Sequence, residues 1–229
     1  MTLLPRTPEP ELMQEAAQAK AYAAADFSAT DQATVDRILE LFSEPPGLGM
    51  RIADLGCGPG NISYRLAEHC PDASILGIDG AAAMLAIAEQ RNQPTPGRGQ
   101  LHFLLVTLPC TSEFLGPWAH SCGAVVSNSL LHHLHNPQVL WAAVRQLAAP
   151  GAALYIKDLR RPDSPPALDA LVALHAADAP PVLRRDYRHS LHAAFRVEEV
   201  EAQLAEAGLS SLRVAAVADR YLEVWGRLP

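Results

Sequence analysis

Long apolar runs are missing from this chain of 229 residues. A membrane-spanning helix needs roughly 20 consecutive apolar residues, and no segment approaches that length. The first residues, 1–6, also lack the apolar core of a secretory leader. These absences predict a cytoplasmic protein with no membrane partner. With 49% hydrophobic residues, the length suits one packed core.

Cysteine is scarce and shows no metal-binding spacing. The four cysteines are Cys57, Cys70, Cys110 and Cys122. Without a C-x-x-C pair, they are expected to be free thiols. Three of the nine histidines lie within residues 132–135, but neighbouring positions on one short loop rarely converge on one ion. No cysteine or carboxylate cluster is near them in sequence, so we expect no metal site.

Positive charge is also in deficit. Lysine and arginine number 18 against 25 acidic residues, which gives a formal net charge of −7. Nucleic-acid affinity comes largely from neutralised phosphates, so we expect no nucleic-acid partner. Composition is silent on the oligomeric state. Arginines still cluster locally, at Arg160 and Arg161 and again at Arg184, Arg185 and Arg188.

The most informative feature that is present is the segment 51–61, a short apolar strand that runs into a glycine-rich turn opening a helix. Asp54 is followed by Gly56, Gly58 and Gly60. Glycines remove side chains that would block a ligand and accept positive φ values. A dinucleotide fingerprint would place its third glycine one residue later. The turn therefore predicts a nucleoside-like cofactor and counts against a nicotinamide-dependent dehydrogenase.

A second acidic residue, Asp79, closes the next apolar run at residues 74–79. In nucleotide-binding units a carboxylate about 20 residues after the glycine turn meets the ribose hydroxyls. The alternative is structural: the glycines only form a turn, and Asp79 only caps the helix that starts near Ala81.

With Met84, these features resemble the class I methyltransferases that use S-adenosylmethionine (SAM). The resemblance extends to residues 124–134, like the fourth strand and the loop facing the methyl donor, and to residues 147–158, like the fifth strand and its preceding turn. It implies an enzyme with SAM as cofactor, the glycine turn holding the amino-acid end and Asp79 the ribose. The candidate cofactor-binding residues are Asp54, Gly56, Cys57, Gly58, Gly60, Asp79, Gly80, Met84, Thr107, Leu108 and Asn128.

One segment departs from the family pattern. Many members carry an acidic residue after the third strand, near the adenine, whereas residues 102–109 contain no carboxylate. Adenine recognition is then expected to use backbone groups around Thr107 and Leu108 together with apolar contact.

The alternation of apolar runs and Gly/Pro punctuation predicts an α/β fold. We expect a doubly wound, mainly parallel seven-stranded sheet with an antiparallel edge hairpin near residues 212–225. One domain should cover residues 1–229. Its parts are an N-terminal helical cap or lid (1–49, helical from about 10 to 42), a cofactor-binding core (50–158), a helical lid insert after the fifth strand (159–196, with a helix at 167–177 ended by Pro180–Pro181), and a C-terminal helix with closing strands (197–229).

The acceptor should bind outside the carboxyl ends of the strands, where ligands of open α/β sheets sit. Methyl transfer requires alignment and exclusion of water. A general base is needed only if the acceptor must lose a proton, and His133 is the first candidate because imidazole titrates near neutral pH. Alternatively, His132 and His133 only begin the following helix.

Other side chains complete the candidate acceptor site. Asp158 and Tyr22 join His133 as candidate catalytic residues, although Asp158 could equally fix an arginine by a salt bridge. A guanidinium pairs well with a carboxylate or phosphate, so the clustered arginines are candidates for binding an anionic acceptor. The alternative is that they form a solvated face of the protein. The candidate substrate-binding residues are His132, Arg160, Arg161 and Arg188.

These observations predict a SAM-dependent methyltransferase acting on a small molecule, with an anionic acceptor as one candidate. A non-methylating SAM enzyme, such as a cyclase or lyase, remains an alternative on the same fold. A SAM-binding regulator without turnover is a second alternative.

Overall fold

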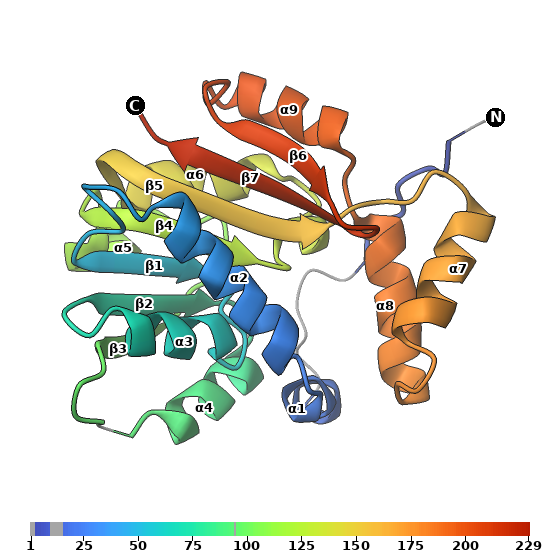
Figure 1. Cartoon of the computed structure of the whole chain (residues 1–229), viewed down its shortest axis with the longest axis horizontal. Helices are drawn as coiled ribbons and strands as arrows, with labels where there is room; N and C mark the ends of the chain where they lie inside the picture. Colours follow the sequence, from blue (N-terminus) through green and yellow to red (C-terminus); the bar gives the residue numbers. More distant parts are fainter. Residues whose placement is uncertain (1–2, 10–15, 94) are drawn as a thin grey trace.

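The computed structural model describes residues 3–9, 16–93 and 95–229. A seven-stranded sheet in the order β3-β2-β1-β4-β5-β7-β6 forms its centre (Figure 1). Strand β7 runs antiparallel to both of its neighbours, β5 and β6, while the other paired strands are parallel. The predicted α/β sheet with an antiparallel edge hairpin is confirmed. The strands are β1 (Arg51–Leu55), β2 (Ser74–Asp79), β3 (Gln100–Leu105), β4 (Cys122–Asn128), β5 (Ala148–Leu159), β6 (Arg213–Val217) and β7 (Tyr221–Arg227).

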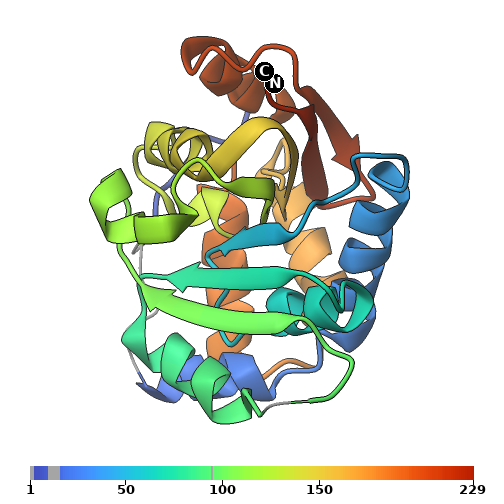
Figure 2. The ribbon, with the colours of Figure 1, turned by 90° about the vertical axis from the view of Figure 1, so that its left-hand side faces the viewer.

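Helices cover both faces of the sheet (Figure 2). On one face α2 and α3 pack through Ile38 and Leu66 against strand residues such as Ile52. On the other face Trp141 of α6 and Leu204 of α9 belong to the larger core cluster. Burial on both faces explains why the parallel strands read as nearly continuous apolar runs. The helical elements are α1 (Ala16–Ala24), α2 (Ser28–Leu41), α3 (Asn61–His69), α4 (Ala82–Arg91), α5 (Ser112–Leu115), η1 (Gly116–Trp118), η2 (Leu131–His133), α6 (Gln138–Leu147), α7 (Pro165–His175), α8 (Pro181–Ala193) and α9 (Val197–Glu206).

The described part of the N-terminal cap contains two helices, α1 and α2, where one helical stretch was expected over residues 10–42. Its first part, residues 10–15, lies outside the described residues. The helix is interrupted between Ala24 and Ser28 because the carboxylate of Asp26 accepts hydrogen bonds from both the backbone N–H and the hydroxyl of Ser28. Such local side-chain bonds compete with helical ones.

The insert after β5 differs from its prediction at the two prolines. Pro180–Pro181 was expected to end the preceding helix, but α7 ends earlier, at His175. Pro181 is instead the first residue of α8, a helix that the sequence pattern did not predict. Proline suits the first position of a helix, because its N–H would have no intrahelical partner there and its φ is already helical. Figure 1 shows α7 and α8 standing across the carboxyl ends of the parallel strands, where a lid was expected.

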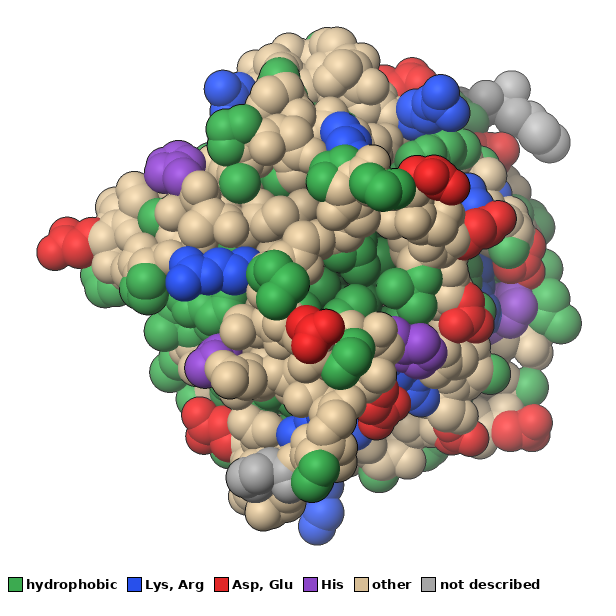
Figure 3. All heavy atoms as spheres, turned by 60° about the vertical axis from the view of Figure 1, so that its left-hand side comes forward, with side chains coloured by type: hydrophobic (Ala, Val, Ile, Leu, Met, Phe, Trp, Pro, Cys, Tyr) green, Lys and Arg blue, Asp and Glu red, His purple; other side chains and the backbone are tan. Residues whose placement is uncertain are grey.

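Two surface properties bear on possible partners. No helix among the described residues is long and apolar enough to cross a membrane. On the face drawn in Figure 3, basic side chains are dispersed among acidic and apolar ones. Within the described part of the chain, that face therefore offers no broad positive surface of the kind that binds nucleic-acid phosphates.

Candidate active site

The main cavity lies at the carboxyl ends of the strands and has a volume of about 750 Å³. That volume is within the range of small-molecule sites. The ends of β1, β2 and β4 form its floor, while α1 and α8 contribute walls. The position agrees with the rule that ligands of open α/β sheets bind at this edge.

The glycine turn after β1 has three residues with positive φ, at +69° for Gly56, +54° for Gly58 and +84° for Gly60. A Cβ at Gly56 would lie 2.8 Å from the Cβ of Leu130, and one at Gly60 would lie 2.9 Å from the ring of Tyr64. At Gly58 it would meet no protein atom within 4 Å. Two glycines therefore allow close packing, and Gly58 leaves open a surface of the cavity.

Asp79 connects the ends of β1 and β2. One carboxylate oxygen accepts from Gly58 N at 2.8 Å and the other from Ala81 N at 2.7 Å. Burial raises the pKa of Asp79, and the backbone hydrogen bonds oppose that shift. A carboxylate has about four acceptor positions, so one is still free when the backbone N–H groups of Gly58, Ala81 and Gly80 have bound, and Asp79 lines the cavity. The two sequence interpretations are therefore compatible: the carboxylate holds the start of α4 and can also accept from ribose hydroxyls.

Asp54 is 1% exposed and lies at the base of the turn. Its carboxylate accepts from the hydroxyl of Ser63 at 2.6 Å. Burial, reinforced by the charge of Asp79, raises the pKa of Asp54 to about 7, although the bond from Ser63 opposes the shift. A cationic ligand in the cavity, which Asp54 lines, would favour the ionised form.

The other candidate cofactor residues also surround the cavity, with one exception. Gly60 does not line it and is instead the N-cap residue that precedes α3. Burial raises the pKa of Cys57 well above its ordinary value, so the thiol stays neutral. The cavity-lining candidates are Gly56, Cys57, Gly58, Gly80, Met84, Thr107, Leu108 and Asn128.

Asp158 lies beside the cavity without lining it, and its hydrogen bonds go to partners other than the arginines considered from the sequence. It is 1% exposed and accepts from Leu131 N at 2.7 Å, from Leu159 N at 2.8 Å and from Nδ1 of His132 at 2.6 Å. None of these bonds involves an arginine. Its carboxylate therefore fixes the η2 loop and orients His132, which makes Asp158 a positioning residue.

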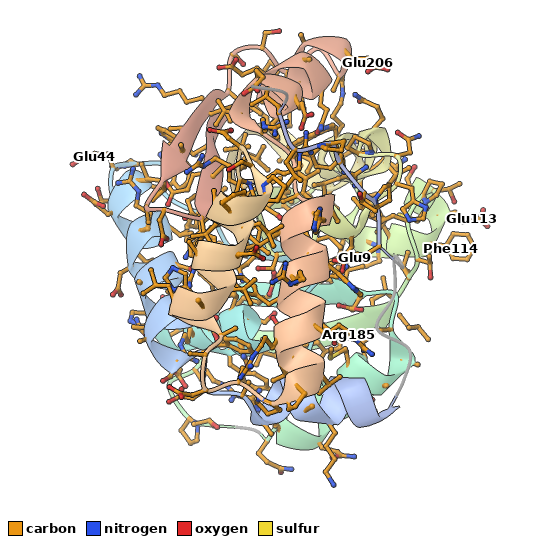
Figure 4. All side chains as sticks on the ribbon, turned by 90° about the vertical axis from the view of Figure 1, so that its right-hand side faces the viewer. Glu9, Glu44, Glu113, Phe114, Arg185 and Glu206 are labelled. Atoms are coloured by element: carbon orange, nitrogen blue, oxygen red, sulfur yellow. The ribbon has the colours of Figure 1, made fainter. Side chains whose placement is uncertain are left out.

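His132 and His133 both line the cavity and both approach the carboxylate of Glu9. Nε2 of His132 is 3.6 Å and Nδ1 of His133 is 3.2 Å from Oε1 of Glu9. The same oxygen accepts from the hydroxyl of Ser190 in α8 at 2.9 Å. In Figure 4, Glu9 lies beside α8 on the side of the molecule that α7 and α8 cover. Sequence reasoning missed Glu9, because only tertiary contacts bring it to a loop more than 120 positions later.

The three arginines expected to bind substrate lie away from the cavity. Arg161 is 2% exposed and donates to the backbone oxygens of Leu4 and Ala194 and to the carboxylate of Glu199. Its contacts hold the N-terminal segment against the insert.

The other two expected anion-binding arginines are engaged elsewhere. Arg160 donates to the backbone oxygen of Asp219 at 3.2 Å. Arg188 forms an ion pair with Asp169 at 2.7 Å. Each of these guanidinium groups thus has a protein partner outside the cavity.

Two other cations line the cavity, Lys157 and Arg220, and sequence reasoning missed both. Lys157 is 9% exposed and donates to Thr34 Oγ1 at 2.9 Å. Its Nζ lies 4.5 Å from the ring centroid of Tyr221, and the Arg220 guanidinium lies 4.9 Å from the same ring. Burial lowers the pKa of Lys157, while the carboxylate of Glu223 favours its charged form. The signal available in the sequence was a lysine directly after the apolar run of residues 152–156.

Two tyrosines, Tyr22 and Tyr187, also line this part of the cavity. Tyr22 packs its ring against Phe27 with centroids 4.9 Å apart. Burial raises the pKa values of both tyrosines, that of Tyr187 to about 12. Both hydroxyls are therefore protonated near neutral pH and can donate hydrogen bonds to an acceptor.

A doubly wound sheet with a glycine turn, an acidic residue at the end of the second strand and a cavity at the strand ends is typical of nucleotide-binding α/β proteins. Comparison with known proteins narrows this class. Residues 53–154 match a family model described as a methyltransferase domain. With the relatives and solved structures described below, this match confirms the resemblance to class I SAM-dependent methyltransferases that the sequence predicts.

Curated relatives match parts of the chain. A trans-aconitate 2-methyltransferase from Streptomyces coelicolor is 37% identical over 121 residues, which are 53% of this chain and 37% of the relative. Its counterpart from Streptomyces avermitilis is 48% identical over 67 residues, 29% of this chain and 23% of the relative. The matched segments thus span well under half the length of these relatives.

Solved structures share the fold. A SAM-dependent methyltransferase from Aquifex aeolicus aligns with a TM-score of 0.64 at 19% identity, over 91% of this chain and 97% of that one. The plantazolicin methyltransferase BamL aligns with a TM-score of 0.67 at 14% identity, over 92% of this chain and 90% of that one. At these identities the likeness concerns the fold.

Proposed function

We propose that this protein binds SAM and transfers its methyl group to a small acceptor that carries a carboxylate or a similar anionic group. The observation that carries the proposal is the division of one cavity into two chemically different parts. One part is formed by the glycine turn and Asp79, and the other contains Lys157 and Arg220 beside partly buried tyrosines. The trans-aconitate relatives act on a polycarboxylate by their names, which supports an anionic acceptor.

The cofactor part fits SAM in three respects. Gly58 leaves open space, because a Cβ added at this residue would have no protein atom within 4 Å. Asp79 presents two carboxylate oxygens to the cavity edge, as ribose hydroxyls require. Asp54 places a buried carboxyl group in the cavity wall, where the cationic amino-acid end or sulfonium of SAM would stabilise its ionised form. When bound, SAM supplies an electrophilic methyl group.

The acceptor part supplies charge and orientation. Lys157 has three N–H donors and uses one on Thr34, so two remain for an anion. Arg220 offers a guanidinium whose paired donors match a carboxylate. These groups would fix the acceptor at one end, and the walls formed by α1 and α8 would exclude water. Alignment of nucleophile, methyl and sulfur is then the main contribution of the protein.

Proton removal is required only for acceptors such as a hydroxyl. His133 remains the proposed base, because it lines the cavity and Glu9, 3.2 Å away, would stabilise its imidazolium form. Asp158 would act indirectly by holding the η2 loop, and Tyr22 would donate a hydrogen bond to the acceptor or cofactor. A preformed carboxylate acceptor needs no base.

Binding and product analysis test the proposal. Calorimetric titration should give micromolar SAM affinity, and Asp79→Asn should weaken it at least about tenfold, which is about 1.4 kcal/mol. The matched control Asp72→Asn alters an exposed carboxylate in the turn before β2 and should leave affinity unchanged. Incubation with trans-aconitate and other small polycarboxylates should release S-adenosylhomocysteine. Methylthioadenosine would instead indicate the cyclase or lyase alternative, and binding without product from any acceptor would indicate a regulator.

The acceptor part has its own matched pair of arginines. Arg220→Met should raise the KM for a carboxylate acceptor at least about tenfold, because a charge-assisted hydrogen bond contributes about 1.5–3 kcal/mol. Arg188→Met removes the same type of side chain outside the cavity and should leave KM unchanged. The reverse result would restore the sequence-based assignment of Arg188 and refute that of Arg220.

A further inference from the structure

A third chemical feature borders the cavity, the cluster of Glu9, His132 and His133. Its three ligating atoms, one from each side chain, all lie within 4.8 Å of one another. Two imidazoles and one carboxylate are ligands that divalent zinc-like cations prefer. The cluster combines η2 with the N-terminal segment, so it exists only in the folded chain.

We propose that Glu9, His132 and His133 form a binding site for a divalent transition-metal ion, with Zn²⁺ as the best-matched ion. The inference goes beyond the proposed function and does not depend on methyl transfer.

The spacing of the ligand atoms supports the site. In a tetrahedral zinc site, bonds of about 2.0–2.2 Å to nitrogen and oxygen place the ligand atoms roughly 3.3–3.6 Å apart. Oε1 of Glu9 lies 3.2 Å from Nδ1 of His133 and 3.6 Å from Nε2 of His132. Both separations therefore approach the zinc values, and the two histidine nitrogens lie within 4.8 Å of each other.

The groups around the cluster support it as well. Asp158 accepts from Nδ1 of His132 at 2.6 Å, which directs Nε2 toward Glu9. A carboxylate behind a ligating histidine fixes its tautomer and raises its basicity as a ligand. Ser190 donates to Oε1 of Glu9 at 2.9 Å and so orients the carboxylate ligand. Both outer contacts are of the kind that accompanies a metal site.

The local charge also favours a cation. Glu9 and Asp158 carry two carboxylates, and the Arg6 guanidinium, which donates to the backbone oxygens of His132 and Leu134, supplies one positive charge. The side chains of Glu9 and His132 are 10% and 3% exposed. A buried carboxylate requires a compensating partner, and a divalent ion would provide it.

Three protein ligands leave a fourth coordination position, as in catalytic zinc sites. Because both histidines line the cavity, that position can be filled by water or by an oxygen of a bound molecule. With the ion bound, His133 is a ligand and no longer a base. A metal-bound hydroxyl or water loses its proton near neutral pH, so the ion would take over the activation of an oxygen acceptor.

Metal binding is tested directly on the whole chain, free of tags, after chelator treatment and dialysis. Zn²⁺ titration by calorimetry should give one equivalent bound, and Co²⁺ should produce the visible absorption of a tetrahedral N/O site. Glu9→Gln and His133→Gln should each weaken Zn²⁺ binding by about 10-fold or more and abolish the Co²⁺ spectrum. The control His69→Gln removes an exposed histidine elsewhere and should change neither.

Two measurements keep the test decisive. Thermal unfolding of the metal-free variants shows that lost binding is not lost folding, and Zn²⁺ should raise the Tm of the unaltered protein but not of Glu9→Gln. Absence of a tight equivalent, or a Co²⁺ spectrum that survives both substitutions, would overturn the site and leave a buried ion-pair cluster. SAM titration of the same samples is separate, so failure of the metal site and failure of the cofactor proposal are distinguishable.

Discussion

Alanine substitutions at Gly56 and Gly58, in the same turn, should lower thermal stability by different amounts. Both glycines have a left-handed backbone conformation, but only Gly56 is crowded by neighbouring side chains. Their φ values are +69° and +54°. Placing an L-residue in this region costs about 1–2 kcal/mol at either position. At Gly56 the new Cβ would also come within 2.8–3.0 Å of three side-chain carbons of Leu130, whereas at Gly58 it would meet nothing within 4 Å.

The magnitude of the difference follows from the crowding. Overpacking of this kind costs about 1–3 kcal/mol beyond the backbone strain. In a chain of this size 1 kcal/mol corresponds to about 2–4 °C, so Gly56→Ala should unfold roughly 2–12 °C below Gly58→Ala. Thermal unfolding followed by circular dichroism measures this difference.

Cofactor binding should show a separate effect at Gly58. The methyl group of Gly58→Ala would occupy the open surface of the cavity and should weaken SAM binding at least about tenfold, or about 1.4 kcal/mol. Calorimetric titration of both variants measures it. Equal melting temperatures would refute the packing argument at Gly56, and unchanged SAM affinity in Gly58→Ala would show that this glycine does not face the cofactor.

Three further substitutions test the electrostatics and the buried contacts. Asp54 has an ordinary pKa of 3.8 that rises to about 7 in the folded protein, so between these values only the unfolded chain has released the proton. The free energy of unfolding should therefore fall by up to about 4 kcal/mol as pH rises from about 4 to 7, and then level off. Urea unfolding at several pH values should show a flatter dependence for Asp54→Asn. Identical pH profiles for the two proteins would contradict this reasoning. Asp158→Asn leaves Nδ1 of His132 and one backbone N–H without a full set of acceptors. The free energy of unfolding, measured in urea, should therefore drop by about 2–3 kcal/mol. An unchanged value would refute the positioning role of Asp158. Arg161→Met should lower Tm, because the guanidinium of Arg161 is buried among backbone oxygens that accept its hydrogen bonds. The KM for the methyl acceptor should not change. A raised KM would support the substrate-binding role predicted from the sequence.

The elements of the cofactor side were predictable because they are local in sequence. The alternating glycines after Asp54 and the acidic end of the next apolar run predicted a strand, a turn and a helix within about 30 residues. Parallel strands with both faces buried are read directly from continuous apolar runs. The role of Pro181 was predicted wrongly because proline is common both after the end of a helix and at the first position of one.

The acceptor side depended on tertiary structure. Sequence clustering favoured Arg160, Arg161 and Arg188, yet the cavity contains Lys157 and Arg220. A cluster in sequence does not determine which way each side chain points, since a strand directs successive residues to opposite faces.

The sequence by itself thus determined the sheet, the glycine turn and the carboxylate of Asp79, because each depends on neighbours along the chain. Only the tertiary structure decided which charges share the cavity. It joined Glu9 to His132 and His133, across more than 120 positions, through the packing of the N-terminal segment against α8 and η2. Contacts of this kind depend on how separate elements pack in space, and no local pattern encodes them.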